Sequence, residues 1–166
     1  MSEGGVGSSF WIDTRDVRRI ARKWGQPAER MLLDELVVSF GRAITAARRE
    51  ANRLIKGGEG SNLARASVQK VTVSGSDVTA EANWDAARSP EGFPYAAAVD
   101  RGRKAFGPKT AKALRFGVNG ETVFAKWVKA APAQNFTGKG LERSRARVVG
   151  EVNAGIARWA DRMAAR

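Results

Sequence analysis

Apolar side chains recur at three- and four-residue steps over residues 28–55, which is the spacing of one face of an α-helix. The stripe consists of Leu33, Leu36, Val37, Phe40, Ile44, Ala47, Ala51 and Leu54. Pro27 suits the first turn of such a helix, and the Gly-rich run 57–61 should end it. We therefore expect a long amphipathic helix over residues 28–55.

A second stripe with helical spacing lies near the C-terminus. It consists of Leu141, Val148, Val152, Ile156, Trp159 and Met163. We expect a helix from about residue 141, preceded by a loop over 132–140. Both helices carry basic residues on the opposite face: Arg42, Arg49, Arg53 and Lys56 on the first, Arg143, Arg147, Arg158 and Arg162 on the second. These faces are either solvated surfaces or docking surfaces for acidic neighbours.

Between the two helices the pattern changes to the two-residue alternation of β-strands. Val71 and Val73 precede a turn at residues 75–77, and the alternating set Val78, Ala80, Ala82 and Trp84 follows it. A second alternation surrounds Asn119-Gly120, a strong hairpin signal, and places Val123, Ala125 and Trp127 on the face of Phe116. We expect two β-hairpins, with Trp84, Trp127 and Trp159 in the core. The apolar segment 95–100 between the hairpins fits either a helix or a strand.

The first residues differ from the rest in composition. Residues 1–9 are rich in Gly and Ser and are expected to form a tail, followed by the apolar group Phe10-Trp11-Ile12. Asp13 or Thr14 could cap a short helix that ends at Gly25. We therefore expect a flexible N-terminal arm with a short helix over residues 1–27. Because this arm is too small to bury Trp11 and Trp24, it should pack on the body or on another subunit.

The order of these elements predicts an α+β fold. An antiparallel sheet of about four strands, made of two hairpins, should be packed by a long helix from the N-terminal half and by the C-terminal helix. Residues 28–166 are expected to form a single domain of this kind. Its size and its 43% hydrophobic content suffice for a core.

The charge balance indicates an acidic or polyanionic partner. The chain has 29 Lys and Arg against 17 Asp and Glu, a formal net charge of +12. Nucleic acid, an acidic protein surface and an anionic membrane all fit such a charge. No apolar stretch approaches the roughly 18–20 residues of a membrane span, and we expect no membrane partner.

The most basic local segment is the loop 101–112, which holds five basic residues and no acidic one. Its candidate contact residues are Arg101, Arg103, Lys104, Phe106, Lys109 and Lys112. One interpretation is an arm that contacts phosphates or an acidic partner, with Phe106 inserted into that partner. The other is a solvated approach to the second hairpin with coincidental charge.

Cys and His are both absent from the chain. Thiolate nucleophiles, Cys/His zinc sites, disulfides and the commonest general base are therefore excluded. No Ser–Lys pair or paired carboxylates at a catalytic spacing stand out either. We expect no enzymatic activity, no cofactor, and no catalytic or metal-binding residues.

Five segments follow one another in a distinctive order: Leu63-Ala-Arg-Ala-Ser-Val68, Tyr95-Ala-Ala-Ala-Val-Asp-Arg-Gly-Arg103, Lys112-Ala-Leu-Arg-Phe116, Val123-Phe-Ala-Lys-Trp-Val-Lys129 and Ala131-Pro-Ala-Gln-Asn-Phe136. In order and spacing they resemble the neck or tail-completion proteins of long-tailed bacteriophages, a family also described as head–tail joining or minor tail proteins. The resemblance covers roughly residues 31–160. The chain departs from the family pattern at Asp100, which stands for Glu, at Arg103 for Thr, at Asn135 for Pro, and at Thr137-Gly138-Lys139, which interrupts the usual Phe-Leu-x-Pro.

The resemblance implies a structural role in the virion. Identical copies would form a ring, expected to be a hexamer, between the head connector and the tail tube or tail terminator. The protein would be assembled in the cytoplasm of the bacterial host and reside in the neck of the particle. Passing or end-held DNA is a further expected neighbour. We expect the loop 101–112 and the N-terminal arm to make the contacts between subunits and rings.

A stand-alone basic nucleic-acid-binding protein is the alternative. The charge favours this class, but no helix-turn-helix, RNA-recognition or zinc signature appears. Exposed strand positions also offer few aromatic residues for base stacking, with Phe124 as the exception.

Overall fold

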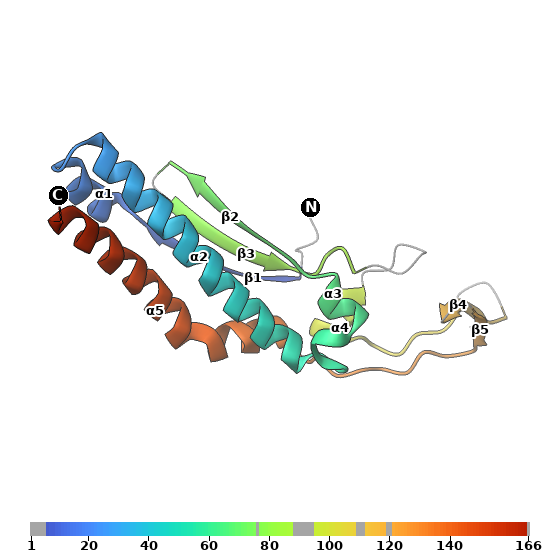
Figure 1. Cartoon of the computed structure of the whole chain (residues 1–166). Coiled ribbons are helices and arrows are strands. Elements are labelled where there is room, and N and C mark those ends of the chain that lie inside the picture. Colours follow the sequence, from blue (N-terminus) through green and yellow to red (C-terminus); the bar gives the residue numbers. More distant parts are fainter. Residues whose placement is uncertain (1–5, 76, 88–94, 109–111, 119–120, 166) are drawn as a thin grey trace.

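Two long helices, α2 (Gln26–Leu54) and α5 (Phe136–Ala164), lie side by side and cover one face of a three-stranded antiparallel sheet (Figure 1). The computed structural model describes residues 6–75, 77–87, 95–108, 112–118 and 121–165. The α+β class is confirmed, as are the long helix in the N-terminal half and the C-terminal helix. Helix α2 begins two residues before the predicted start and ends one residue before the predicted end.

The sheet has the strand order β1-β3-β2. Strands β2 (Val68–Ser74) and β3 (Asp77–Asn83) form the first predicted hairpin, in the register that pairs Val71 with Ala80. Alternate residues of β3 are buried against the helices, namely Val78, Ala80 and Ala82. The period-two pattern therefore correctly identified the buried face of β3. On the edge strand β2, Val71 is only half-buried and Val73 is exposed.

The edge strand β1 (Gly7–Asp13) is a correction to the sequence prediction. Residues 7–9 were expected in a tail and Phe10-Trp11-Ile12 in an irregular apolar group, yet all of them pair antiparallel with β3. The Phe10 ring packs on the Phe40 ring of α2 with centroids 5.2 Å apart. The composition of this Gly/Ser-rich segment resembles that of a linker. The segment forms a strand because it pairs with β3, which lies about seventy residues further along the chain.

Helix α1 (Arg15–Arg22) confirms the predicted short helix and is held on α2 by charge. Arg22 Nε and Arg18 Nε donate to the two carboxylate oxygens of Glu29 at 2.9 and 2.7 Å. These hydrogen bonds, the one from Arg22 foremost, lower the pKa of Glu29. The stabilisation is complete above the ordinary pKa of a glutamate and is lost as the pH falls through the lowered value.

The N-terminal segment is therefore part of the body over its described residues and does not form a separate flexible arm. Val6 and Ala21 belong to the same buried cluster as Leu32 and Phe40. Residues 1–5 of the predicted tail lie outside the described residues.

Short elements connect the sheet to the helices. A 3-10 turn η1 (Gly58–Gly60) and helix α3 (Asn62–Arg65) lead from α2 into β2. The segment of ambiguous identity is a helix, α4 (Tyr95–Asp100). Residues 88–94, which precede α4, and Ser76 of the first hairpin turn lie outside the described residues.

Helix α5 begins five residues earlier than predicted, within the expected loop 132–140. The carboxylate of Asp100 accepts hydrogen bonds from the backbone N–H of Thr137 at 3.1 Å and from its hydroxyl at 3.0 Å. Asp100 thus satisfies the first turn of a helix that is remote in sequence, as a capping side chain does locally. The run from Thr137 to Gly140 holds two glycines and resembles a loop when it is considered without this partner.

The two long helices approach closely at two glycines of α5. A Cβ added at Gly140 would lie 2.7 Å from the backbone of Ala51, and one at Gly155 would collide with the Ser39 side chain. Small residues at these positions are therefore required for the helices to pack at this distance. Gly150 on the same helix has open space where a Cβ would lie.

Substituting these glycines should have opposite effects. Gly140→Ala should reduce the free energy of unfolding by about 1–3 kcal/mol, because the helices must separate to admit the methyl group. The matched variant Gly150→Ala should raise it by about 0.5–1 kcal/mol, since alanine is the better helix former and meets nothing. Urea unfolding followed by circular dichroism measures both. Equal changes of either sign in the two variants would contradict the packing described.

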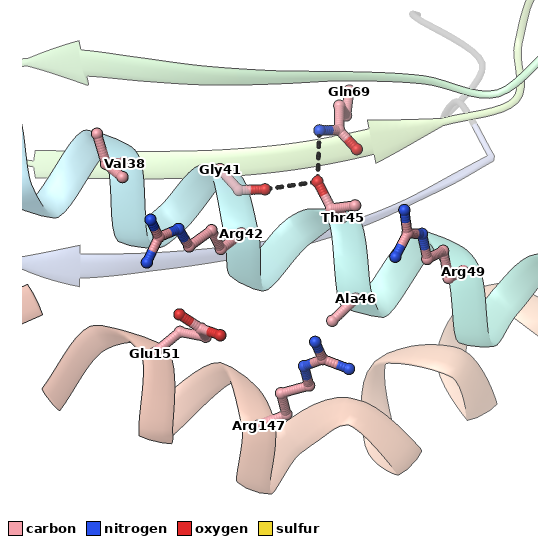
Figure 2. A pocket seen from close by; sticks show the side chains of 9 residues that line it. All are labelled: Val38, Gly41, Arg42, Thr45, Ala46, Arg49, Gln69, Arg147 and Glu151. Atoms are coloured by element: carbon pink, nitrogen blue, oxygen red, sulfur yellow. Dashed lines mark hydrogen bonds between the residues drawn. The ribbon is translucent and has the colours of Figure 1, made fainter. Parts of the chain in front are cut away.

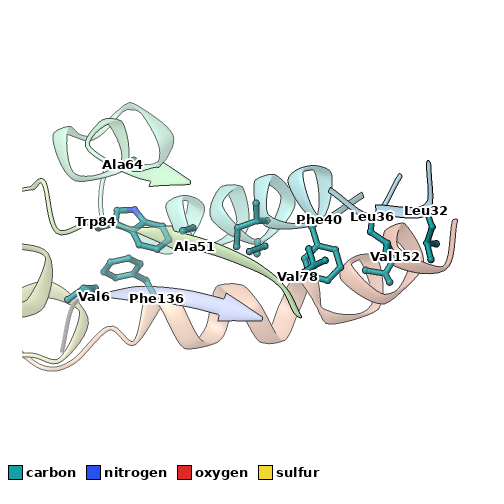
Figure 3. Packing of buried hydrophobic residues seen from close by; sticks show 14 of the residues in the cluster. Val6, Leu32, Leu36, Phe40, Ala51, Ala64, Val78, Trp84, Phe136 and Val152 are labelled. Atoms are coloured by element: carbon teal, nitrogen blue, oxygen red, sulfur yellow. The ribbon is translucent and has the colours of Figure 1, made fainter. Parts of the chain in front are cut away.

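The core ends in an aromatic pair at one end of the sheet (Figure 3). The fully buried rings of Trp84 and Phe136 meet edge to face with centroids 5.3 Å apart. Trp84 Nε1 donates to Asn52 Oδ1 at 2.9 Å. Trp159 is buried as well and donates to the Ala28 carbonyl at 2.9 Å. The predicted core positions of Trp84 and Trp159 are confirmed.

The second hairpin exists, but it does not extend the sheet. Strands β4 (Leu114–Val118) and β5 (Glu121–Ala125) form a separate two-stranded sheet, far from the helices (Figure 1). The predicted single sheet of about four strands is not confirmed. The predicted turn residues Asn119 and Gly120 lie outside the described residues.

Candidate functional site

The chain projects from the body between α4 and α5 (Figure 1). Residues 101–131, called the arm below, run outward in an extended path, turn at the β4–β5 hairpin, and run back. Two pairs of backbone hydrogen bonds join the outgoing and returning chains, one pair between Arg103 and Ala131 and one between Phe106 and Val128. Over its described residues, the arm thus consists of a narrow ribbon that stands away from the long helices (Figure 1).

The root of the arm is tightly attached to the body. Gly102 has φ of 77°, and a Cβ there would lie 2.7 Å from the backbone nitrogen of Ala133. The backbone N–H of Asn135 donates to the Asp100 carbonyl at 2.8 Å, and that of Gln134 donates to the Val99 carbonyl at 3.2 Å. The turn at Gly102 therefore has a left-handed backbone, and only glycine combines this conformation with so close a contact.

The arm concentrates the positive charge of the protein. Residues 101–131 include eight basic residues and one acidic residue, so they carry more than half of the net charge of +12. Exposed lysine side chains project from the described part of the arm: Lys104, Lys112, Lys126 and Lys129. In the described residues none of these four lysines forms an ion pair. Their charge is available to a partner.

The predicted contact residues of the loop 101–112 occupy the outgoing chain of the arm. Arg101, Arg103, Lys104 and Lys112 are exposed, and Arg103 Nε donates to the Lys129 carbonyl across the ribbon at 3.3 Å. Lys109 lies outside the described residues. The loop is therefore half of a larger structure whose other half, residues 121–131, also carries basic residues.

Aromatic side chains on the arm are exposed to solvent. Phe124 and Trp127 have 67% and 68% of their surface accessible, and Phe106 is also exposed. The predicted core position of Trp127 is wrong, because the hairpin before it stands away from the helices that would have covered an apolar face. Exposed aromatic rings are enriched at contact surfaces for another macromolecule, and the neighbouring lysines add a positive charge that attracts an acidic partner.

Sequence reasoning missed the returning chain as part of this surface. A signal was present in the segment 123–129: Phe124 and Trp127 fall on opposite faces of the strand pattern, and so do Lys126 and Lys129. A strand packed on a core has one polar face and one apolar face. Aromatic and basic residues on both faces indicate a ribbon that is exposed on both sides.

Trp11 and Trp24 do not join the arm. Both are largely exposed. Trp11 lies on β1 directly opposite Thr79, on the face of the sheet away from the helices. Trp24 lies in the turn between α1 and α2, at the end of the body opposite the arm (Figure 1). Although β1 and α1 pack on the body, they leave these two rings uncovered, so the predicted contact residues fall on three separate surfaces.

The described residues contain neither a cluster of metal ligands nor a helix that could span a membrane. No three Asp or Glu side chains gather there in an arrangement that could hold a metal ion. None of the helices in that part of the chain combines the length and the apolar character needed to cross a lipid bilayer.

Comparisons of the chain with protein-family models, with curated proteins and with solved structures found no match. Inference about function therefore depends on the residues and geometry described above.

Proposed function

We propose that the protein is a structural component of a bacteriophage neck, in which identical copies form a ring that joins the head connector to the tail tube or tail terminator. In this proposal the chain catalyses no reaction. It works by binding other copies of itself and the neighbouring virion proteins, with a hexamer as the expected ring. The motif order of the sequence supports the assignment to the neck, and the arm is the single observation that supports assembly.

The arm supports assembly because its aromatic rings are largely uncovered and its ribbon is joined by few hydrogen bonds. Its ribbon is joined by two bridges and a terminal hairpin, and its two most exposed aromatic rings, Phe124 and Trp127, are about two-thirds accessible. An isolated two-stranded ribbon is marginally stable in water. Packing against a neighbouring protein would bury these rings and order the ribbon, so the binding site on the neighbour would complete the fold of the arm.

A projecting element and a separate body also suit a ring. A closed ring of identical subunits needs a heterologous interface, in which one surface of a subunit binds a different surface of the next. The arm supplies one such surface, and the body supplies the other. The exposed Trp11 and Trp24 rings mark two places on the body where such a contact could form.

Neutralising the arm tests the proposal. The variant Lys104→Gln, Lys112→Gln, Lys126→Gln, Lys129→Gln removes four exposed charges and leaves the arginine that braces the ribbon. Ring formation by the purified protein, observed by sedimentation and negative-stain imaging, should be abolished in this variant. Its circular dichroism spectrum and melting temperature should not change, because surface substitutions of this kind rarely alter stability.

A matched variant controls for the total charge. Arg30→Gln, Lys56→Gln, Arg65→Gln, Arg145→Gln removes four exposed charges from the body. This control should assemble like the unaltered protein. Rings that persist in the arm variant, or rings that are lost equally in both variants, would refute the role of the arm.

Nucleic-acid binding by the arm is the second candidate function. The observation that favours it is the exposure of Phe106, Phe124 and Trp127 next to lysines, since aromatic stacking and basic side chains together bind single strands. In a neck, such an arm would hold the end of the packaged DNA. Binding of a labelled oligonucleotide, titrated with salt, separates the two functions: tight binding near physiological salt that falls steeply as salt rises favours the nucleic-acid role.

A further inference from the structure

A shallow groove of about 410 Å³ runs between α2 and α5 and is bordered by β2 (Figure 2). Three arginines from two helices line it: Arg42 and Arg49 from α2 and Arg147 from α5. Glu151, one turn further along α5, also lines it. The groove is formed by residues of the body and shares none with the arm.

Within the described residues, the charged side chains that line the groove take part in no ion pair: Arg42, Arg49, Arg147 and Glu151. Arg42 and Arg49 are two helical turns apart, a rise of about 10.5 Å along α2. Three guanidinium groups in one groove thus offer bidentate hydrogen bonds to anionic groups spaced over about this length.

The uncharged residues that line the groove indicate which kind of anionic partner fits it. Thr45 Oγ1 donates to the Gly41 carbonyl at 2.7 Å and accepts from Gln69 Nε2 at 2.8 Å, so this polar wall is held in place (Figure 2). Val38 and Ala46 add apolar surface, and about half of the Val38 side chain is exposed. An occupant with both carboxylates and apolar side chains would use all of these features.

Glu151 makes a nucleic-acid backbone the poorer fit. A phosphodiester strand carries a negative charge at every nucleotide and would place one of them near this carboxylate. A protein segment can avoid that repulsion, because a residue with a hydrogen-bond donor can lie opposite Glu151 while acidic residues lie opposite the arginines.

We propose that this groove is a docking site for an acidic segment of a partner protein, bound by Arg42, Arg49 and Arg147 with an apolar side chain of the segment against Val38. The site is independent of the arm, and the proposal does not require the role of the arm in ring formation. Part of the basic character of the helix faces would then serve a second partner, bound in the groove that α2 and α5 form beside β2.

The test measures the binding of a fluorescein-labelled peptide with the repeat Glu-Glu-Leu by anisotropy, near physiological salt. The unaltered protein should bind it, and Arg42→Gln, Arg49→Gln, Arg147→Gln should weaken the binding at least about tenfold, since three charge-assisted contacts are lost. Arg30→Gln, Arg65→Gln, Arg145→Gln removes the same charge elsewhere on the body and should bind like the unaltered protein. The four-lysine arm variant should also retain binding.

Each contrary result overturns the proposal. Absent binding by the unaltered protein, or equal loss in the groove variant and its control, would show that the groove is not a specific site. Loss in the arm variant would place the peptide on the arm. If a labelled oligothymidylate bound more tightly than the peptide and the groove variant abolished its binding, the groove would be a nucleic-acid site.

Discussion

Trp84→Ala is expected to lower the free energy of unfolding by about 3–5 kcal/mol, the usual cost of truncating a large buried aromatic side chain. The indole is fully buried and stacks edge to face on Phe136, the first residue of α5 (Figure 3). Its removal leaves a cavity where the sheet, α2 and α5 meet. Equilibrium unfolding in urea, monitored by circular dichroism, measures the loss.

A second variant isolates the hydrogen bond of Trp84. Trp84→Phe keeps an aromatic ring but removes the donor to the buried Asn52 Oδ1. The unfulfilled acceptor should account for about 1–2 kcal/mol of the loss, in addition to the cost of the smaller ring. A change below about 1 kcal/mol in Trp84→Ala would mean that the site is not packed as described.

Glu35→Gln is expected to destabilise the protein by about 1.5–3 kcal/mol, because it removes the buried negative charge that accepts hydrogen bonds from two arginines of α5. Glu35 lies on α2 and is almost fully buried. Its carboxylate binds Arg158 Nε at 3.0 Å and Arg162 Nη1 at 2.7 Å, both from α5. Arg158 also donates to the Ser39 hydroxyl at 2.9 Å. Thermal and urea unfolding measure the effect.

Arg162→Gln provides the matched comparison, since it removes the more exposed partner of the same carboxylate. The Arg162 side chain is 58% exposed, and its loss should cost less than about 1 kcal/mol. Equal losses in the free energy of unfolding from Glu35→Gln and Arg162→Gln would show that the burial of the Glu35 carboxylate does not determine how much this network stabilises the protein. The network also corrects the sequence expectation for Arg158, which was placed on the outer face of the C-terminal helix but is half-buried against α2, whereas Arg162 is exposed as expected.

The spacing of apolar residues predicted a helix or strand correctly where a single segment of the chain contained the whole pattern. The stripe from Leu33 to Leu54 identified α2, and the alternation from Val71 to Trp84 identified the β2–β3 hairpin and the buried face of β3. In both cases the side-chain period and the flanking glycines belong to the same segment. The prediction therefore needed no knowledge of what packs on it.

The errors occurred where a remote residue supplies the missing partner. Strand β1 depends on pairing with β3, and the first turn of α5 depends on the carboxylate of Asp100. The half-buried position of the Arg158 side chain depends on its ion pair with Glu35, which is 123 residues away in sequence. No local pattern reports such partners, because the same residues in isolation are compatible with a loop or a solvated surface.

The candidate site was predicted in part. The sequence indicated the basic loop that forms the outgoing chain of the arm, but it placed Trp127 in a core. The groove between α2 and α5 was visible only as two basic helix faces with two open interpretations. Which arginines line a groove together is decided by the relative placement of the two helices.

Local periodicity and composition were enough to predict the α+β class, the two long helices, both hairpins and the strongly basic character of the chain. Three features emerged only from the packing of distant segments: the second hairpin stands apart on an arm, β1 completes the sheet, and three arginines share one groove. The spacing of apolar residues along a segment shows which face of the helix or strand they occupy. Whether that face is covered depends on contacts with segments that are distant in sequence.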